Sequence, residues 1–168
     1  MNLFVLTNDH GINARWHFNS HVVKMPLEAA QLMCTARHVL GGSCLPIPYK
    51  PTHKNHPCAK WVRESYGNYM WTYQYGKALC NEYQYRYGRE HACLKVLDDC
   101  LLDFPLFDSK DMTPFTLAMP DEFKSGSAFL SYKLYYMSKK ESLHKWKDRE
   151  IPYWFESKDL IKEKANEV

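Results

Sequence analysis

The residues most capable of chemistry form a polar stripe between positions 21 and 38. Six polar side chains recur there at steps of three or four residues, the spacing of one helix face. They are His21, Lys24, Glu28, Gln31, Thr35 and His38. Such a stripe is either a solvent-exposed face or the wall of a cleft. On a cleft wall, Glu28 would be the general acid or base with His21 as its neighbour. Lys24 would neutralise a phosphate or act as an amine nucleophile.

A second polar cluster stands directly before a helix start predicted at Pro57. Its members are Lys50, Thr52, His53, Lys54, Asn55 and His56. Backbone N–H groups at a helix start bind anions, and two lysines add positive charge, so we expect contact with a phosphate of a nucleotide or nucleic acid. The alternative is a capped loop in which Asn55 or His56 bonds the helix start. The histidines and Cys58 form an incomplete metal-ligand set, and we expect neither a metal nor a cofactor.

Aromatic and basic side chains also alternate in two later segments. Residues 81–91 combine tyrosine rings with Arg86 and Arg89, which suits bases and backbone phosphates, although buried tyrosines and glutamate-paired arginines would be equally ordinary. Residues 132–147 add the aromatic rings of Tyr132, Tyr135, Tyr136 and Trp146. Lysines stand at positions 139, 140, 145 and 147 of the same segment, and they also complement a helix dipole. Together these groups favour a DNA or nucleotide partner. The side chains expected to stack on bases are Trp61, Tyr85 and Tyr136.

Composition limits what can position these groups. The 168 residues are 45% hydrophobic and 24% charged with a net charge of +3, which allows a real core and only a mild attraction to acidic partners. An aromatic content of 15% suits a dense core or a nucleobase site. No apolar run is long enough for a membrane span, and the first residues lack a signal-peptide pattern. Motifs of serine hydrolases, P-loop NTPases, dinucleotide enzymes and zincins are absent.

The helical elements are predicted as follows. Asp9 caps a short helix to Phe18, and Asn19 or Ser20 caps a helix over 21–40 that starts or kinks at Pro26. The longest helix covers 58–87 and ends at Gly88, and further helices cover 92–102 and 127–147. Residues 1–6 are expected to be buried, and 151–155 to lie across the surface.

The fold prediction is mainly α, a single compact helical domain over residues 1–168 with a long central helix and an aromatic C-terminal tail. Residues 155–168 are expected to form a charged, partly mobile end.

Several segments resemble a family of small proteins from tailed phages. They are HVVKM (21–25) with Glu28, THKNHPC (52–58), YRYG (85–88), TPF (113–115), AMPDEFK (118–124) and IPYWF (151–155). This resemblance spans almost the whole chain and implies a viral source and the host cytoplasm as location.

More distantly, the chain resembles phage pyrimidine-dimer DNA glycosylases of the endonuclease V type. These enzymes place a histidine seven residues before a catalytic glutamate, as His21 and Glu28 stand here. The resemblance implies a Schiff-base mechanism on the N-terminal α-amine, assisted by that glutamate. Two positions depart from the family pattern. Asn2 is not the small residue that permits removal of Met1, and Leu27 replaces an arginine.

The favoured interpretation is a phage DNA-binding protein that acts on a flipped-out pyrimidine base in the manner of an N-glycosylase or lyase. Flipping fits the aromatic surplus, because an extruded base must be stacked upon. One alternative is a transferase that modifies nucleotides or DNA bases. The other is a non-catalytic phage protein that binds a host partner, in which Glu28→Gln would change nothing.

Overall fold

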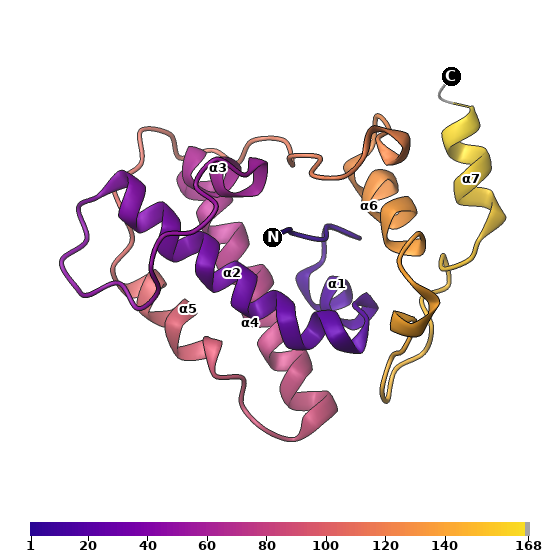
Figure 1. Cartoon of the computed structure of the whole chain (residues 1–168), viewed down its shortest axis with the longest axis horizontal. Helices are drawn as coiled ribbons and strands as arrows, with labels where there is room; N and C mark the ends of the chain where they lie inside the picture. Colours follow the sequence, from indigo (N-terminus) through magenta and orange to yellow (C-terminus); the bar gives the residue numbers. More distant parts are fainter. Residues whose placement is uncertain (167–168) are drawn as a thin grey trace.

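The computed structural model describes residues 1–166 and contains helices without any strand in that part of the chain. Seven α-helices and two short 3-10 turns succeed one another in these residues (Figure 1). The helices are α1 (His10–Trp16), α2 (Asn19–Leu40), α3 (Pro57–Glu64), α4 (Tyr66–Tyr87), α5 (Cys93–Leu102), α6 (Ala128–Met137) and α7 (Lys158–Ala165). The 3-10 turns are Asp121–Phe123 and Glu141–Leu143. The prediction of a mainly α fold is therefore confirmed. None of these helices combines the length and the apolar character that crossing a membrane requires.

The two longest helices, α2 and α4, pack against each other at the centre, and α1, α3 and α5 surround them. Gly76 of α4 permits this close approach. A Cβ atom at this position would lie 2.9 Å from a Leu97 methyl group of α5 and 3.1 Å from the Ala29 Cβ of α2. A side chain at position 76 would therefore crowd Leu97 and Ala29 and require them to shift.

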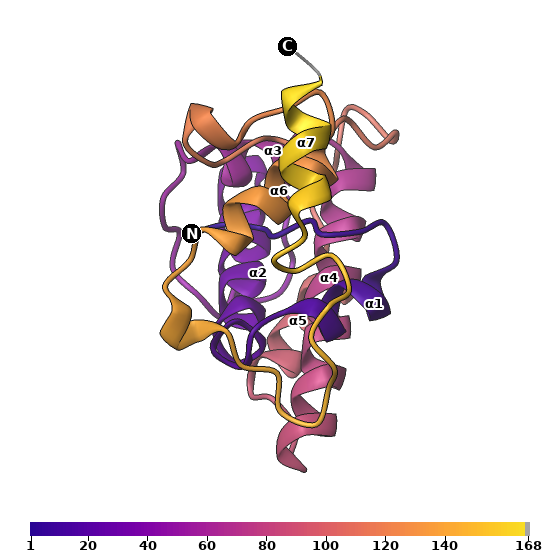
Figure 2. The ribbon, with the colours of Figure 1, turned by 90° about the vertical axis from the view of Figure 1, so that its right-hand side faces the viewer.

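The N-terminal segment is extended and buried, as predicted, and crosses the molecule beneath α6 (Figure 2). Side chains take the place of a neighbouring strand. The Phe4 N–H donates to the Tyr75 hydroxyl, and Asn13 accepts from the Leu6 N–H and donates to the Phe4 carbonyl. These bonds satisfy the backbone of a segment that has no sheet to join.

The long helix predicted over 58–87 is two helices. Ser65 has an extended backbone (φ −150°, ψ 160°), and its side chain accepts from the Asn68 N–H, which caps α4. The predicted end at Gly88 is confirmed, because its φ of 68° stops the helix in the left-handed region.

Two other boundaries differ from the prediction. The cap of α2 is Phe18 without a side-chain bond, because Asn19 instead accepts from Arg86 and from the Lys147 N–H. α6 ends at Met137 rather than near 147, and the chain beyond it turns so that Trp146, Trp154 and Phe155 pack on the core.

The end of the chain, predicted to be charged and partly mobile over 155–168, contains a helix, and its mobility stays a prediction. Ser157 caps helix α7 over 158–165, and Leu160 packs against the core cluster. Residues 167 and 168 lie outside the described part of the chain.

Candidate active site

A pocket of about 290 Å³ lies where the start of the chain, α2 and α6 meet. Its wall is formed by Met1, Asn2, Phe4, His21, Lys24, Met25, Glu28, His56, Ala118, Tyr135 and Lys139. The structure thus brings the three predicted catalytic residues His21, Lys24 and Glu28 to one pocket, together with His56 from the loop before α3. The polar stripe of α2 is a pocket wall over this part of its length.

Glu28 is the buried carboxylate of the pocket, with 6% of its surface exposed. Its Oε2 accepts a 2.7 Å hydrogen bond from the backbone nitrogen of Asn2, and its Oε1 lies 3.2 Å from the Lys24 ammonium. Met1 also lines the pocket, so the α-amine of the chain is one residue away from the nitrogen that Glu28 binds. The carboxylate therefore fixes the position of the chain start.

Asn2 is a residue of this site that the sequence patterns did not reveal. Its side-chain nitrogen donates to the Ala118 carbonyl at 2.8 Å, and its oxygen accepts from the Leu3 N–H at 2.8 Å. The Cys58 thiol donates to the same oxygen at 3.6 Å. These bonds hold the first residues of the chain against α3 and the 113–120 loop. Only its position in sequence, next to Met1, could have drawn attention to it.

The pKa values of His21 and His56 are both lowered, which favours the neutral imidazole. Burial lowers the pKa of His21 to about 3, and the nearby His17, Lys139 and Lys24 act in the same direction. Burial also lowers the pKa of His56, and the N-terminal ammonium and His53 add to that effect. His56 Nδ1 accepts from the Cys58 N–H and so caps α3. Both rings are consequently neutral hydrogen-bonding groups near neutral pH.

The remaining charge in the pocket is mostly positive. Lys24, Lys139 and Met1 line it, the N-terminal charge acts on His56 of the same wall, and Glu28 is the one carboxylate among the lining residues. Leu27, which stands where the resembled glycosylases have arginine, is 38% exposed on α2. The positive charge therefore comes from the two lysines instead, and it suits an anionic ligand such as DNA.

Comparison with known proteins identifies the family. The sequence model of one family, described as pyrimidine dimer DNA glycosylase, matches residues 1–96, more than half of the 168 residues. The chain belongs to the pyrimidine dimer DNA glycosylase family. No curated protein and no solved structure matches the chain. The matched part includes His21, Lys24, Glu28 and His56, and the family description makes DNA the substrate.

Three residues predicted to contact DNA are buried in this family member. Trp61 is 4% exposed, and its indole nitrogen donates to the Pro114 carbonyl, so it packs within the core. Tyr136 is 0% exposed and bonds Phe18 and His21. Arg86 is 2% exposed, and all its guanidinium nitrogens bond other groups of the chain. The predictions for these three residues are wrong, because helix packing turns their side chains inward.

The other predicted contact residues lie at the surface. Lys50, His53, Lys54 and Asn55 are exposed on the loop before α3, and within this cluster His56 is the member that lines the pocket. Arg89 is exposed and donates to the Tyr83 hydroxyl. Their proposed contact with a DNA backbone remains a prediction.

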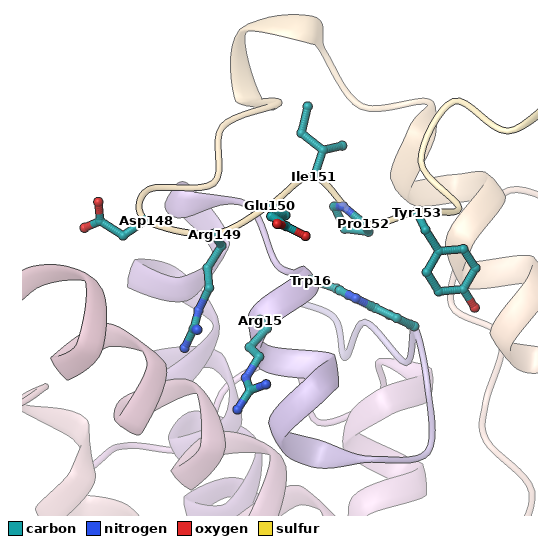
Figure 3. A pocket seen from close by; sticks show the side chains of 8 residues that line it. All are labelled: Arg15, Trp16, Asp148, Arg149, Glu150, Ile151, Pro152 and Tyr153. Atoms are coloured by element: carbon teal, nitrogen blue, oxygen red, sulfur yellow. The ribbon is translucent and has the colours of Figure 1, made fainter.

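Tyr85 belongs to a different surface, a groove between α1, α4 and residues 148–153. It is 56% exposed, and the Arg149 guanidinium lies 3.6 Å from its ring centre. Two adjoining hollows of about 400 and 480 Å³ share Arg15 and Arg149, whose guanidinium groups point in the same direction (Figure 3). The sequence patterns missed both arginines of this groove, which contains none of the predicted catalytic residues.

Arg149 also completes a buried ion-pair network. It forms two hydrogen bonds of 2.9 Å to Glu82, which Arg86 contacts at 2.8 Å. Burial alone raises the pKa of Glu82, but the bonds from Arg149 and Arg86 outweigh it and hold that pKa below its ordinary value. Within residues 1–166, no group of three or more His, Cys, Asp or Glu side chains is arranged to hold a metal ion.

Proposed function

We propose that this protein removes a flipped-out pyrimidine base from damaged DNA in the pocket around Glu28. The 2.7 Å bond between the Asn2 nitrogen and Glu28 Oε2 carries this proposal. It keeps the chain start beside a buried carboxylate, and so places a candidate amine nucleophile next to a candidate proton acceptor. The family membership of residues 1–96 supports the same chemistry.

The proposed reaction starts when the α-amine attacks C1′ of the deoxyribose. A bond forms between the nitrogen and C1′, and the bond between C1′ and the base nitrogen breaks. The base leaves with the electron pair and takes up a proton, while Glu28 accepts the proton that the amine loses. The lone pair of the nitrogen then forms a double bond to C1′ while the C1′–O4′ bond breaks, and O4′ takes back the proton that Glu28 accepted. A protonated Schiff base remains on the chain start, and Glu28 is again a carboxylate. Because Asn2 does not favour removal of Met1, we assign the amine to Met1, which lines the pocket.

The depth of the carboxylate supports the proposal of base flipping. Glu28 is 6% exposed at the wall of a pocket of about 290 Å³, so a base stacked within a duplex would not reach it. Tyr135 is a partly exposed aromatic ring of this pocket, and we propose it as the surface that contacts the extruded base. Lys24, with a side chain that is 66% exposed, would contact an adjacent phosphate.

The source and location of the protein are proposed on sequence resemblance. The segments HVVKM, THKNHPC and AMPDEFK support a tailed-phage source, and a phage source places the protein in the host cytoplasm.

The test uses end-labelled duplexes that contain one thymine dimer, uracil or a hydroxymethylated pyrimidine. We expect the wild-type protein to cleave the glycosidic bond of one thymine of the dimer, whose base stays attached to the other thymine. Borohydride should trap a covalent DNA adduct that peptide mass analysis locates at Met1. Glu28→Gln should slow glycosidic cleavage by about 100-fold or more, the scale of a lost acid or base. Glu122→Gln, an exposed glutamate of the 121–123 turn, is the matched control and should keep full activity.

Absence of both glycosidic cleavage and a trapped adduct on every duplex would refute the proposal. If the protein still bound DNA with a steep salt dependence in that case, a binding or base-modifying role would replace it.

A further inference from the structure

The hydrogen bonds of the His21 ring link the pocket to the core. His21 lines the pocket, yet its Nδ1 lies 2.9 Å from the hydroxyl of Tyr136, a tyrosine of α6 with no exposed surface. The same hydroxyl lies 2.7 Å from the backbone nitrogen of Phe18. Phe4 stacks on the imidazole at 4.7 Å and fixes its plane.

These contacts decide which nitrogen of His21 carries the proton. The Phe18 N–H is only a donor, so it occupies a lone pair of the Tyr136 oxygen. The hydroxyl proton then needs an acceptor, and among the described residues Nδ1 of His21 is the one within reach. If Nδ1 carried the proton instead, the buried hydroxyl proton would have no acceptor, which native structures avoid. A neutral imidazole whose Nδ1 accepts must be protonated on Nε2.

The Nε2 atom is free to contact a ligand. Within residues 1–166 it has no hydrogen-bond partner, and it is not one of the buried polar atoms without a partner, so it remains accessible at the pocket. The groups that face the ring resist its protonation. Burial, His17, Lys139 and Lys24 all lower the pKa of the ring. Lys24 belongs to α2, His17 follows α1, and Lys139 follows the end of α6 at Met137. Tyr136 of α6 faces Nδ1, and Glu28 is the carboxylate of the pocket wall.

We propose that Tyr136 is a positioning residue that holds His21 as its Nε2–H tautomer, so that His21 donates a hydrogen bond to an oxygen of the bound nucleotide. The hydrogen bond from His21 to a nucleotide rests on the proposed function, whereas the assignment of the tautomer does not. In this role His21 neither accepts nor releases a proton during the reaction. It supplies a fixed donor for a pyrimidine carbonyl or a deoxyribose oxygen on which negative charge develops.

The chain contains a matched control in a second tyrosine–histidine pair. His17 Nδ1 lies 2.7 Å from the Asn13 carbonyl, which can only accept, so this ring is protonated on Nδ1. Its Nε2 accepts from the Tyr75 hydroxyl at 3.1 Å, and that hydroxyl accepts from the Phe4 N–H. The two buried histidines are therefore expected in opposite tautomers, and His17 does not line the pocket.

The first experiment reads the tautomers without DNA. Long-range ¹H–¹⁵N correlation spectra of histidine-labelled protein at neutral pH should show His21 protonated on Nε2 and His17 on Nδ1. Tyr136→Phe should give His21 a mixture of tautomers and leave His17 unchanged, and Tyr75→Phe should leave His21 unchanged. A wild-type His21 that is protonated on Nδ1, or charged at neutral pH, overturns the inference whether or not Tyr136→Phe folds.

The second experiment measures how much the Nε2–H donor of His21 contributes to the rate of the reaction. His21→Gln keeps an amide donor that does not titrate, so it should retain activity within about 10-fold, whereas His21→Leu should lose about 100-fold. Tyr136→Phe should lower the rate at neutral pH, because part of the His21 population then lacks the Nε2–H donor, and Tyr75→Phe should not lower it in this way. Equal losses in His21→Gln and His21→Leu would overturn the donor role. A protein inactive on every duplex with the expected tautomers would refute the proposed function and the ligand clause, and leave the positioning by Tyr136 standing.

Discussion

Arg86→Gln distinguishes an arginine that stabilises the fold from one that binds DNA. The guanidinium donates to Glu82 at 2.8 Å and to the Arg15 carbonyl at 2.9 Å. It also donates to the His17 carbonyl and the Asn19 side chain, both at 2.9 Å. Arg86 thereby ties α4 to the junction between α1 and α2, which places His21 at the pocket.

The expected loss in the free energy of unfolding follows from the hydrogen-bond acceptors that glutamine leaves without a donor. Glutamine has one amide nitrogen for the four acceptors, while Arg149 continues to pair with Glu82. Each buried acceptor without a donor costs about 1–3 kcal/mol, and breaking a buried ion pair costs about 3–5 kcal/mol. We therefore expect Arg86→Gln to lower the free energy of unfolding by about 3–5 kcal/mol.

Urea unfolding followed by tryptophan fluorescence measures this loss. Arg89→Gln is the control, because Arg89 is exposed and should change stability by less than about 1 kcal/mol. The salt dependence of DNA binding provides the second measurement, and folded Arg86→Gln should keep the wild-type slope. A loss below about 1 kcal/mol together with a slope reduced by about one unit would refute the reasoning and make Arg86 a phosphate contact.

Two further predictions concern stability. Lowering the pH from 7 to 4.5 should destabilise the protein, because burial lowers the pKa of His17 to about 4 and of His21 to about 3. Both rings then stay neutral in the folded state while they protonate in the unfolded chain, at a cost of about 2 kcal/mol each. Glu82 adds to the loss at lower pH, since its depressed pKa stabilises the fold only while the carboxylate is ionised. Urea unfolding across this pH range measures the free energy of unfolding, which should fall as the pH falls. A free energy of unfolding that does not change with pH would contradict the prediction. Gly76→Ala should destabilise by about 1–3 kcal/mol despite its better helix propensity, because the new Cβ lies 2.9 Å from Leu97. Thermal unfolding should show the loss, with partial recovery in Gly76→Ala combined with Leu97→Val; an unchanged melting temperature would contradict it.

Local signals in the sequence predicted most helix ends and failed where tertiary contacts compete with them. Asp9 and Gly88 act within one turn, so the start of α1 and the end of α4 were readable. Asn19 is an equally good cap by type, but Arg86 and Lys147 use its side chain instead. Ser65 stood within a continuous helical pattern, and its role as the cap of α4 was not read from the sequence.

The candidate site shows the same division. The spacing of His21, Lys24 and Glu28 follows from the pitch of one helix, so the sequence by itself put them on a common face and favoured acid–base chemistry beside a positive charge. Only the tertiary structure decided that this face meets the chain start, because the contact between Asn2 and Glu28 spans 26 residues. It also decided that Tyr136 and Arg86 bond the core instead of DNA. Helix period determines which residues share a face, whereas the packing of distant segments determines what that face meets, and no local pattern encodes that partner.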